Sequence, residues 1–82
     1  MELNDFIQNF ALQFDDTEVS EFKAETRFRE IEEWSSLTAL SVIAMADEEY
    51  GVSLKGDDIR NSETINDLYL IVCSKLSSVY SH

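Results

Sequence analysis

Residues 32–51 read EEWSSLTALSVIAMADEEYG, and this stretch gives the clearest helix prediction in the chain. Ser35 and Ser36 stand where the helix would begin, and a serine side chain readily accepts a hydrogen bond from a helix's unpaired first-turn N–H groups. Gly51 follows the last residue of the pattern, where a left-handed C-cap is common. We therefore expect a helix over 37–50. Its predicted core-facing stripe comprises Leu37, Leu40, Ile43, Ala44 and the residues from Ala46 to Tyr50.

Two further amphipathic patterns flank this helix. Between Leu3 and Phe14, and again over 65–79, apolar residues recur at the three- and four-residue spacing of one helix face. Thr64, followed three residues later by Asp67, resembles a capping box at the start of the last helix. A brief helix is predicted around 57–60.

Residues 15–34 form a long connection between the first two predicted helices. Its apolar residues show no sustained period, so we expect an irregular loop with at most a helical turn, fastened to the core by Phe28, Ile31 and Trp34. The predicted fold class is therefore all-α: a small four-helix bundle, with three principal helices, one short helix and a long first loop. Residues 1–82 would form a single domain.

The chain is strongly acidic, with 17 Asp and Glu against 6 Lys and Arg and a formal net charge of −11. Nucleic acids and anionic membranes bind through Lys and Arg, so both are disfavoured as partners, whereas basic protein surfaces are favoured. Solubility alone is the competing explanation for the charge. A single cysteine excludes an internal disulfide, and no leader or membrane-spanning segment is recognised. We expect a monomer in the cytoplasm.

Catalytic motifs are scarce. The only histidine, His82, is the final residue, and Cys73 falls within the last predicted helix, where we interpret it as a buried thiol. No CxxC, HExxH or EF-hand pattern occurs, and the acids of 47–49 are interpreted as a solvated helix face. With two glycines, no glycine-rich phosphate loop is present. We expect no catalytic residue and no metal site.

A serine at a helix N-terminus is also a candidate site for covalent attachment, because this end of a helix stabilises a phosphate ester through unpaired N–H groups and the helix dipole. The chain resembles the acyl carrier proteins at this point. That family has a phenylalanine and an acid in its first loop, an Asp-Ser-Leu motif, a helix ending in acids, an aromatic residue and glycine, and a Thr-Val-x-Asp opening of the last helix. The matching residues here are Phe28, Glu30, Ser36, Leu37, 47–51 and 64–68.

The resemblance implies a carrier and not an enzyme. Ser36 would receive 4′-phosphopantetheine from coenzyme A in a magnesium-dependent reaction of a separate phosphopantetheinyl transferase, the holo-carrier synthase. The arm would hold an acyl or aminoacyl group as a thioester for a fatty-acid, polyketide or other specialised pathway. Its partners would be that transferase, a loading ligase, and synthases or transferases with basic docking surfaces.

The resemblance also gives candidate partner contacts on the second helix, although core packing or simple solvation competes for each of them. They are Leu37, Leu40, Ala44, Met45, Asp47, Glu48 and Glu49.

The main departure from the family pattern is at Ser35. Ser35 occupies the position of the motif's aspartate and removes one negative charge beside Ser36. Trp34, in place of a small residue, resembles stand-alone carriers of specialised bacterial pathways. The missing acid motivates an alternative function, a carrier-like interaction module whose serine is never modified.

Overall fold

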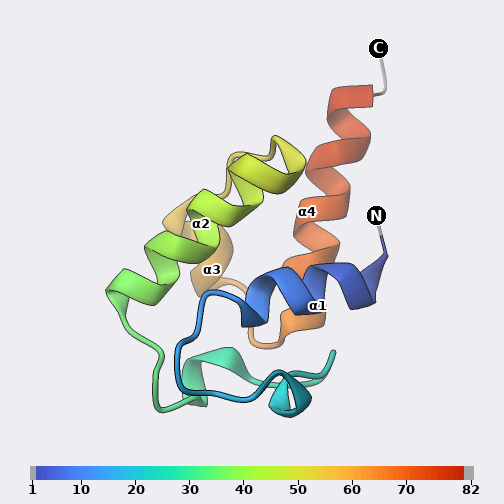
Figure 1. Cartoon of the computed structure of the whole chain (residues 1–82). Helices are drawn as coiled ribbons and strands as arrows, with labels where there is room; N and C mark the ends of the chain where they lie inside the picture. The colour runs from blue at the N-terminus through green and yellow to red at the C-terminus, as the bar shows by residue number, and fades with distance from the viewer. Residues whose placement is uncertain (1, 81–82) are drawn as a thin grey trace.

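The computed structural model describes residues 2–80, with side chains as far as Leu76, as a helical fold joined by loops (Figure 1). No β-strand occurs within this described range, where Arg27 and Thr64 form one isolated antiparallel bridge. The all-α prediction is therefore confirmed. The α-helices are α1 (Leu3–Ala11), α2 (Ser36–Tyr50), α3 (Gly56–Arg60) and α4 (Ile65–Tyr80), and the 3-10 helices are η1 (Val19–Glu21) and η2 (Phe28–Glu30).

Helix α1 is the central packing element. It packs against both α2 and α4, and α3 packs against α4. Figure 1 shows α2 in green and α4 in orange to red inclined to one another, with the loop between α1 and α2 running along the lower edge. No helix within residues 2–80 combines the length and apolar character needed to cross a membrane.

Aromatic rings fill the core around Phe10, which is fully buried. Five other rings have centroids between 5.5 and 6.4 Å from that of Phe10. Because aromatic pairs at such distances add to the burial of large apolar surfaces, this aromatic cluster joins α1 to the long loop. Its members are Phe6, Phe10, Phe14, Phe22, Phe28 and Trp34.

The first helix ends earlier than its apolar pattern predicts. The pattern reaches Phe14, but the regular helix stops at Ala11. The chain then tightens, because the Phe14 N–H donates to the Ala11 carbonyl at 3.0 Å, a three-residue step of the 3-10 type. Phe14 remains buried, so the ring keeps the core position that the periodicity indicated.

Helix α2 forms where it was predicted, but its buried face is different. Leu37 and Leu40 are 77% and 61% exposed, and Ala44 and the acids of 47–49 are also exposed, so the predicted core-facing stripe is wrong at these positions. The core side consists of Val42, Met45 and Ala46. Apolar residues surround the middle of this helix, and such a pattern does not identify the face that will be covered.

Two predicted helix ends are confirmed, the glycine C-cap of α2 and the capping box at the start of α4. Gly51 follows α2 with φ of 65°, in the left-handed region that favours glycine. At the start of α4, the Asp67 N–H donates to Thr64 Oγ1 and the Thr64 N–H donates to Asp67 Oδ2, both at 3.1 Å. The N–H groups of Thr64 and Glu63 also lower the pKa of Asp67.

The long loop is held to the C-terminal half of the fold at its second helical turn, η2, and just before it. Arg29 Nη1 donates to the carbonyls of Ile59 and Arg60 at 2.9 and 3.0 Å, at the end of α3. The N–H of Ile65 donates to the carbonyl of Thr26 at 3.1 Å. These bonds tie the loop to the C-terminal half of the fold, and Phe28, Ile31 and Trp34 pack against the core as predicted.

Candidate functional site

Ser35 and Ser36 have different roles at the start of α2. Ser35 is the N-cap, with extended backbone angles, and its Oγ accepts a hydrogen bond from the Thr38 N–H at 3.3 Å. The same Oγ lies 3.2 Å from Thr38 Oγ1. Ser36 is the first helical residue, and its side chain is exposed. The hydroxyl of Ser35 is therefore used in the helix cap, whereas that of Ser36 faces solvent.

The environment of Ser36 favours a negatively charged substituent. The first turn of α2 contains no acidic residue. The N–H groups of a first helical turn point outward, and together with the helix dipole they give this end a partial positive charge. Thr38 Oγ1 also donates to the Glu33 carbonyl at 3.1 Å, which fixes the backbone that leads into the helix.

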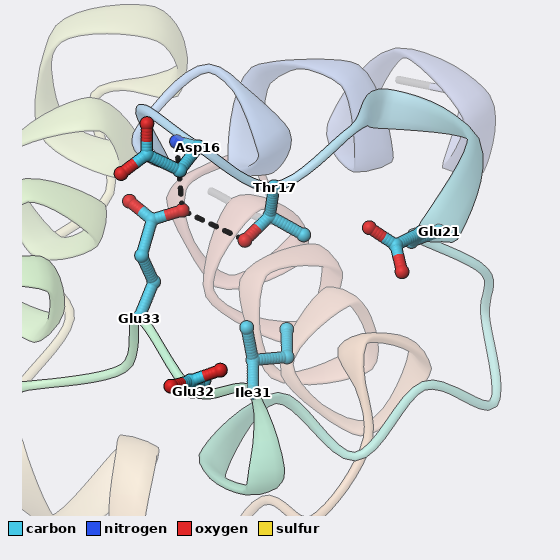
Figure 2. Close-up of a pocket in the computed structure, with 6 residues that line it drawn as sticks. All are labelled: Asp16, Thr17, Glu21, Ile31, Glu32 and Glu33. Atoms are coloured by element: carbon cyan, nitrogen blue, oxygen red, sulfur yellow. Dashed lines mark hydrogen bonds between the residues drawn. The ribbon is translucent and has the colours of Figure 1, made fainter.

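Glu33 fastens the segment that leads into α2 to residues 15–17, in the loop just after α1. Its carboxylate accepts hydrogen bonds from the N–H of Asp15 at 2.7 Å, the N–H of Asp16 at 2.9 Å and the hydroxyl of Thr17 at 2.7 Å. Figure 2 shows the Glu33 side chain reaching across to Asp16 and Thr17. The start of the long loop is thereby bonded to its end, two residues before Ser35.

These donors stabilise the ionised form of Glu33. The hydroxyl of Thr17 has the largest effect and lowers the pKa of Glu33 from its ordinary value of 4.5. Desolvation opposes it as the second-largest effect, and the backbone N–H groups of Asp15, Asp16 and Thr17 lower the pKa further. The folded state therefore binds this proton less tightly than the unfolded chain. The resulting stabilisation is present above about pH 4.5 and is lost as the pH falls through the lower pKa of the folded state.

We expect Glu33→Gln to be less stable than the wild type at neutral pH, because a neutral amide accepts these bonds less strongly and presents only one oxygen. The difference should shrink well below pH 4.5, where the wild-type carboxylate also becomes protonated. Urea unfolding midpoints at neutral and acidic pH measure this difference in stability between the variant and the wild type. Glu32→Gln, at the exposed neighbouring position, is the control. Equal shifts for both variants at every pH would contradict the assigned role of Glu33.

A shallow hollow of about 620 Å³ lies beside this clamp, and its lining is shown in Figure 2. Its carboxylates come from the first and the last part of the long loop. The two oxygens of the Glu33 carboxylate already accept the hydrogen bonds just described. Within the described residues, no three His, Cys, Asp or Glu side chains converge closely enough to hold a metal ion. The lining residues are Asp16, Thr17, Glu21, Ile31, Glu32 and Glu33.

Six of the seven predicted partner contacts are exposed. Leu37, Leu40 and Ala44 lie at helical spacing on one face of α2, and the exposed acids of 47–49 follow at its far end. Met45 is the exception: it is 4% exposed and belongs to the core, so its prediction as a partner contact is corrected. It lies on the side of α2 that meets α1, and the exposed Ala44, Glu48 and Glu49 line a hollow between that side and the end of α1.

Sequence reasoning missed the role of Glu33, which looked like one acid in an acidic run. Its three donors lie 16 to 18 residues upstream, and only the turn-forming Asp15, Asp16 and Thr17 hinted at unpaired N–H groups. Cys73 is half-buried instead of fully buried, and its hydrogen bond with Tyr69 raises the pKa of that phenol. His82 lies outside the described residues.

Comparison of the chain with models of known families, with curated proteins and with solved structures gave no match. The features that matter are an exposed serine at a helix start, a fixed approach segment and an acidic outer helix face.

Proposed function

We propose that this chain is an acyl or aminoacyl carrier protein that bears 4′-phosphopantetheine on Ser36. One observation carries the proposal: Ser36 is exposed at the first position of α2, while the hydroxyl of its neighbour Ser35 caps the helix through Thr38. A transferase can approach the Ser36 Oγ without breaking a hydrogen bond that the helix needs. The same arrangement argues against Ser35 as the attachment residue.

The residues near Ser36 fit a phosphodiester. The positive end of the α2 dipole and the absence of an acidic residue from its first turn both favour a charged phosphate there. Glu33, the nearest acid before the serines in the sequence, has its carboxylate directed into the clamp with Asp15, Asp16 and Thr17. When bound, the group supplies a terminal thiol on a flexible arm, on which cargo is held as a thioester.

The protein's own contribution is presentation and recognition. The clamp and the cap hold Ser36 in one place, and an exposed residue on a rigid frame is presented to a partner at low entropic cost. In this proposal the outer face of α2 meets a transferase, a loading ligase and synthases with basic docking surfaces, because its acids attract them electrostatically. Leu37 and Leu40 then supply apolar contact area beside Ser36.

The test begins with the purified wild-type chain, incubated with coenzyme A, magnesium and a broad-specificity phosphopantetheinyl transferase. The expected result is an intact mass increased by one phosphopantetheine, with fragmentation assigning it to Ser36 and not to Ser35. Omission of coenzyme A is the control. An unchanged mass with every transferase, including one from the native host, would contradict the proposal and favour the unmodified interaction module.

A further inference from the structure

A groove lies between α1 and the first part of the long loop, and it has a volume of about 330 Å³. One wall is the start of α1, and the other is η1, the cyan turn of Figure 1, with the residues that follow it. Pockets that hold small molecules have volumes of roughly 300–1,000 Å³, so this α1–η1 groove is large enough for one. The complete lining is Leu3, Asn4, Ile7, Gln8, Val19, Phe22, Lys23 and Ala24.

The floor of the α1–η1 groove is apolar. Ile7 and Phe22 are 8% and 5% exposed and belong to the core. Val19 is 51% exposed, so the edge of the groove on η1 is an apolar side chain in contact with water. A ligand that covers Val19 removes this surface from water, which is favourable only where the covering group is itself apolar. The floor and this edge therefore favour a ligand with an apolar body.

Three polar side chains surround this floor. Asn4 and Gln8 are exposed and lie four residues apart on one face of α1, and Lys23 is exposed just after η1. None of the three side chains forms a hydrogen bond or an ion pair with another residue that the structure describes. Amide and ammonium N–H groups are donors, so the three side chains together can bind an anionic group at one end of a ligand.

The charge of the lining is positive, in contrast to that of the whole chain. Of the 17 Asp and Glu in the sequence, none lines the α1–η1 groove as the structure describes it. Glu21, two residues before Lys23, lines the separate hollow beside Glu33 instead. Lys23 is therefore the only charged residue of the lining, and it favours an anion over a cation.

Hydrogen bonds fix the loop segment that carries Lys23. The Lys23 N–H donates to Thr26 Oγ1 at 2.8 Å, and the Thr26 N–H donates to the Lys23 carbonyl at 3.1 Å. The N–H of Asn66, at the start of α4, donates to the Ala24 carbonyl at 2.9 Å. This wall of the groove is therefore formed before a ligand arrives, which reduces the entropy that binding costs.

We propose that the α1–η1 groove binds a small organic anion with an apolar body. The apolar body packs on Ile7 and Phe22 and covers Val19. The anionic group accepts hydrogen bonds from Lys23 and from the two exposed amides of α1. No residue of α2 lines the groove as described, so this site is separate from Ser36 and does not rest on the function proposed for that serine.

The unmodified full-length chain allows a direct test with phenylbutyrate as the probe. Amide chemical shifts, followed at constant ionic strength, should change saturably at residues 3–8 and 19–24. The expected Kd is about 1 mM, because so small a ligand makes few contacts. Phenylbutyramide has the same body without the charge and should bind about threefold more weakly. Phenylbutylamine, with the opposite charge, should bind more weakly again.

Two variants separate the contributions of charge and of apolar surface. Lys23→Gln should weaken the binding of phenylbutyrate about threefold and leave that of phenylbutyramide unchanged. Its matched control is Lys55→Gln, at an exposed lysine before α3 and outside the groove. Val19→Gln should weaken both ligands about fivefold, because the ligand then covers a polar side chain. Leu70→Gln, at an exposed leucine of α4, is the control for it. Circular dichroism verifies that all variants remain helical.

Four results would overturn the proposal. They are the absence of saturable shift changes at the lining residues, equal binding of phenylbutyrate and its neutral amide, and equal effects of Lys23→Gln and Lys55→Gln. The fourth is self-association in sedimentation that Val19→Gln removes, because a second copy of this chain would then cover the groove. Since Ser36 is unmodified throughout, none of these results bears on the attachment of phosphopantetheine, and failure of that attachment would leave this proposal in place.

Discussion

Ser36→Ala is expected to abolish the gain of one phosphopantetheine completely, whereas Ser35→Ala retains it. The Ser36 Oγ is the exposed nucleophile in our proposal, and alanine has no oxygen to accept the group. Ser35 acts in the cap through Thr38, so its loss weakens the start of α2 without removing the acceptor. Intact mass after incubation with coenzyme A, magnesium and the transferase distinguishes the two variants.

The stabilities of the two variants provide the control, because the variant that is still modified should be the less stable one. Removal of an N-cap serine costs about 1 kcal/mol, so Ser35→Ala should be the less stable variant while remaining the modified one. Ser35→Asp retains a capping side chain and restores the acid of the family motif, and it should be modified at least as fast as the wild type. Modification that survives Ser36→Ala but is lost in Ser35→Ala would show that the attachment residue is Ser35.

Where the sequence contained a specific capping signal, at the end of α2 and the start of α4, it predicted the helix end correctly. Gly51 adopts the left-handed conformation that its position after the helix indicated, and Thr64 and Asp67 exchange the bonds of a capping box. Such features involve residues at most a few positions apart, so the chemistry of the residue types is sufficient to identify them. The separation of Ser35 as a cap from Ser36 as an exposed residue depends on the same local geometry.

Long-range packing was the part that could not be read from the sequence. The middle of α2 is apolar on every side, and only the position of α1 determines that Met45 is covered while Leu40 is not. The hydrogen bonds of Glu33 could not be predicted for the same reason, because their donors come from a turn far upstream in the sequence. In both cases the deciding partner lies on another element, and no pattern within the element contains that information.

The aromatic cluster connects this packing to the candidate site. Trp34, immediately before the two serines, stacks on Phe10 with parallel rings whose centroids are 6.4 Å apart, and its centroid is 4.9 Å from that of Phe28. The residue that leads into α2 is therefore fixed against α1 by its ring as well as by the Glu33 clamp. Loss of the ring at position 10 should loosen the core and the approach to Ser36 together.

Phe10→Ala is expected to lower the free energy of unfolding by about 3–5 kcal/mol, because it removes a fully buried ring and leaves a cavity in the cluster. Domains of this kind are stabilised by only about 5–15 kcal/mol, so much of the population should unfold at low urea concentration. Trp34 is the only tryptophan, and its stacking on Phe10 makes its fluorescence a direct reporter.

Two controls separate the loss of the ring from the loss of apolar surface in general. Phe10→Leu keeps much of the buried volume and should cost clearly less than the alanine variant. Leu12→Ala removes an exposed side chain two residues away and should change stability by about 0.5 kcal/mol or less. If Phe10→Ala were as mild as Leu12→Ala, the ring at position 10 would not be the centre of the core. The position of Ser36 would then have to depend on the hydrogen bonds of Glu33 and Thr38 alone.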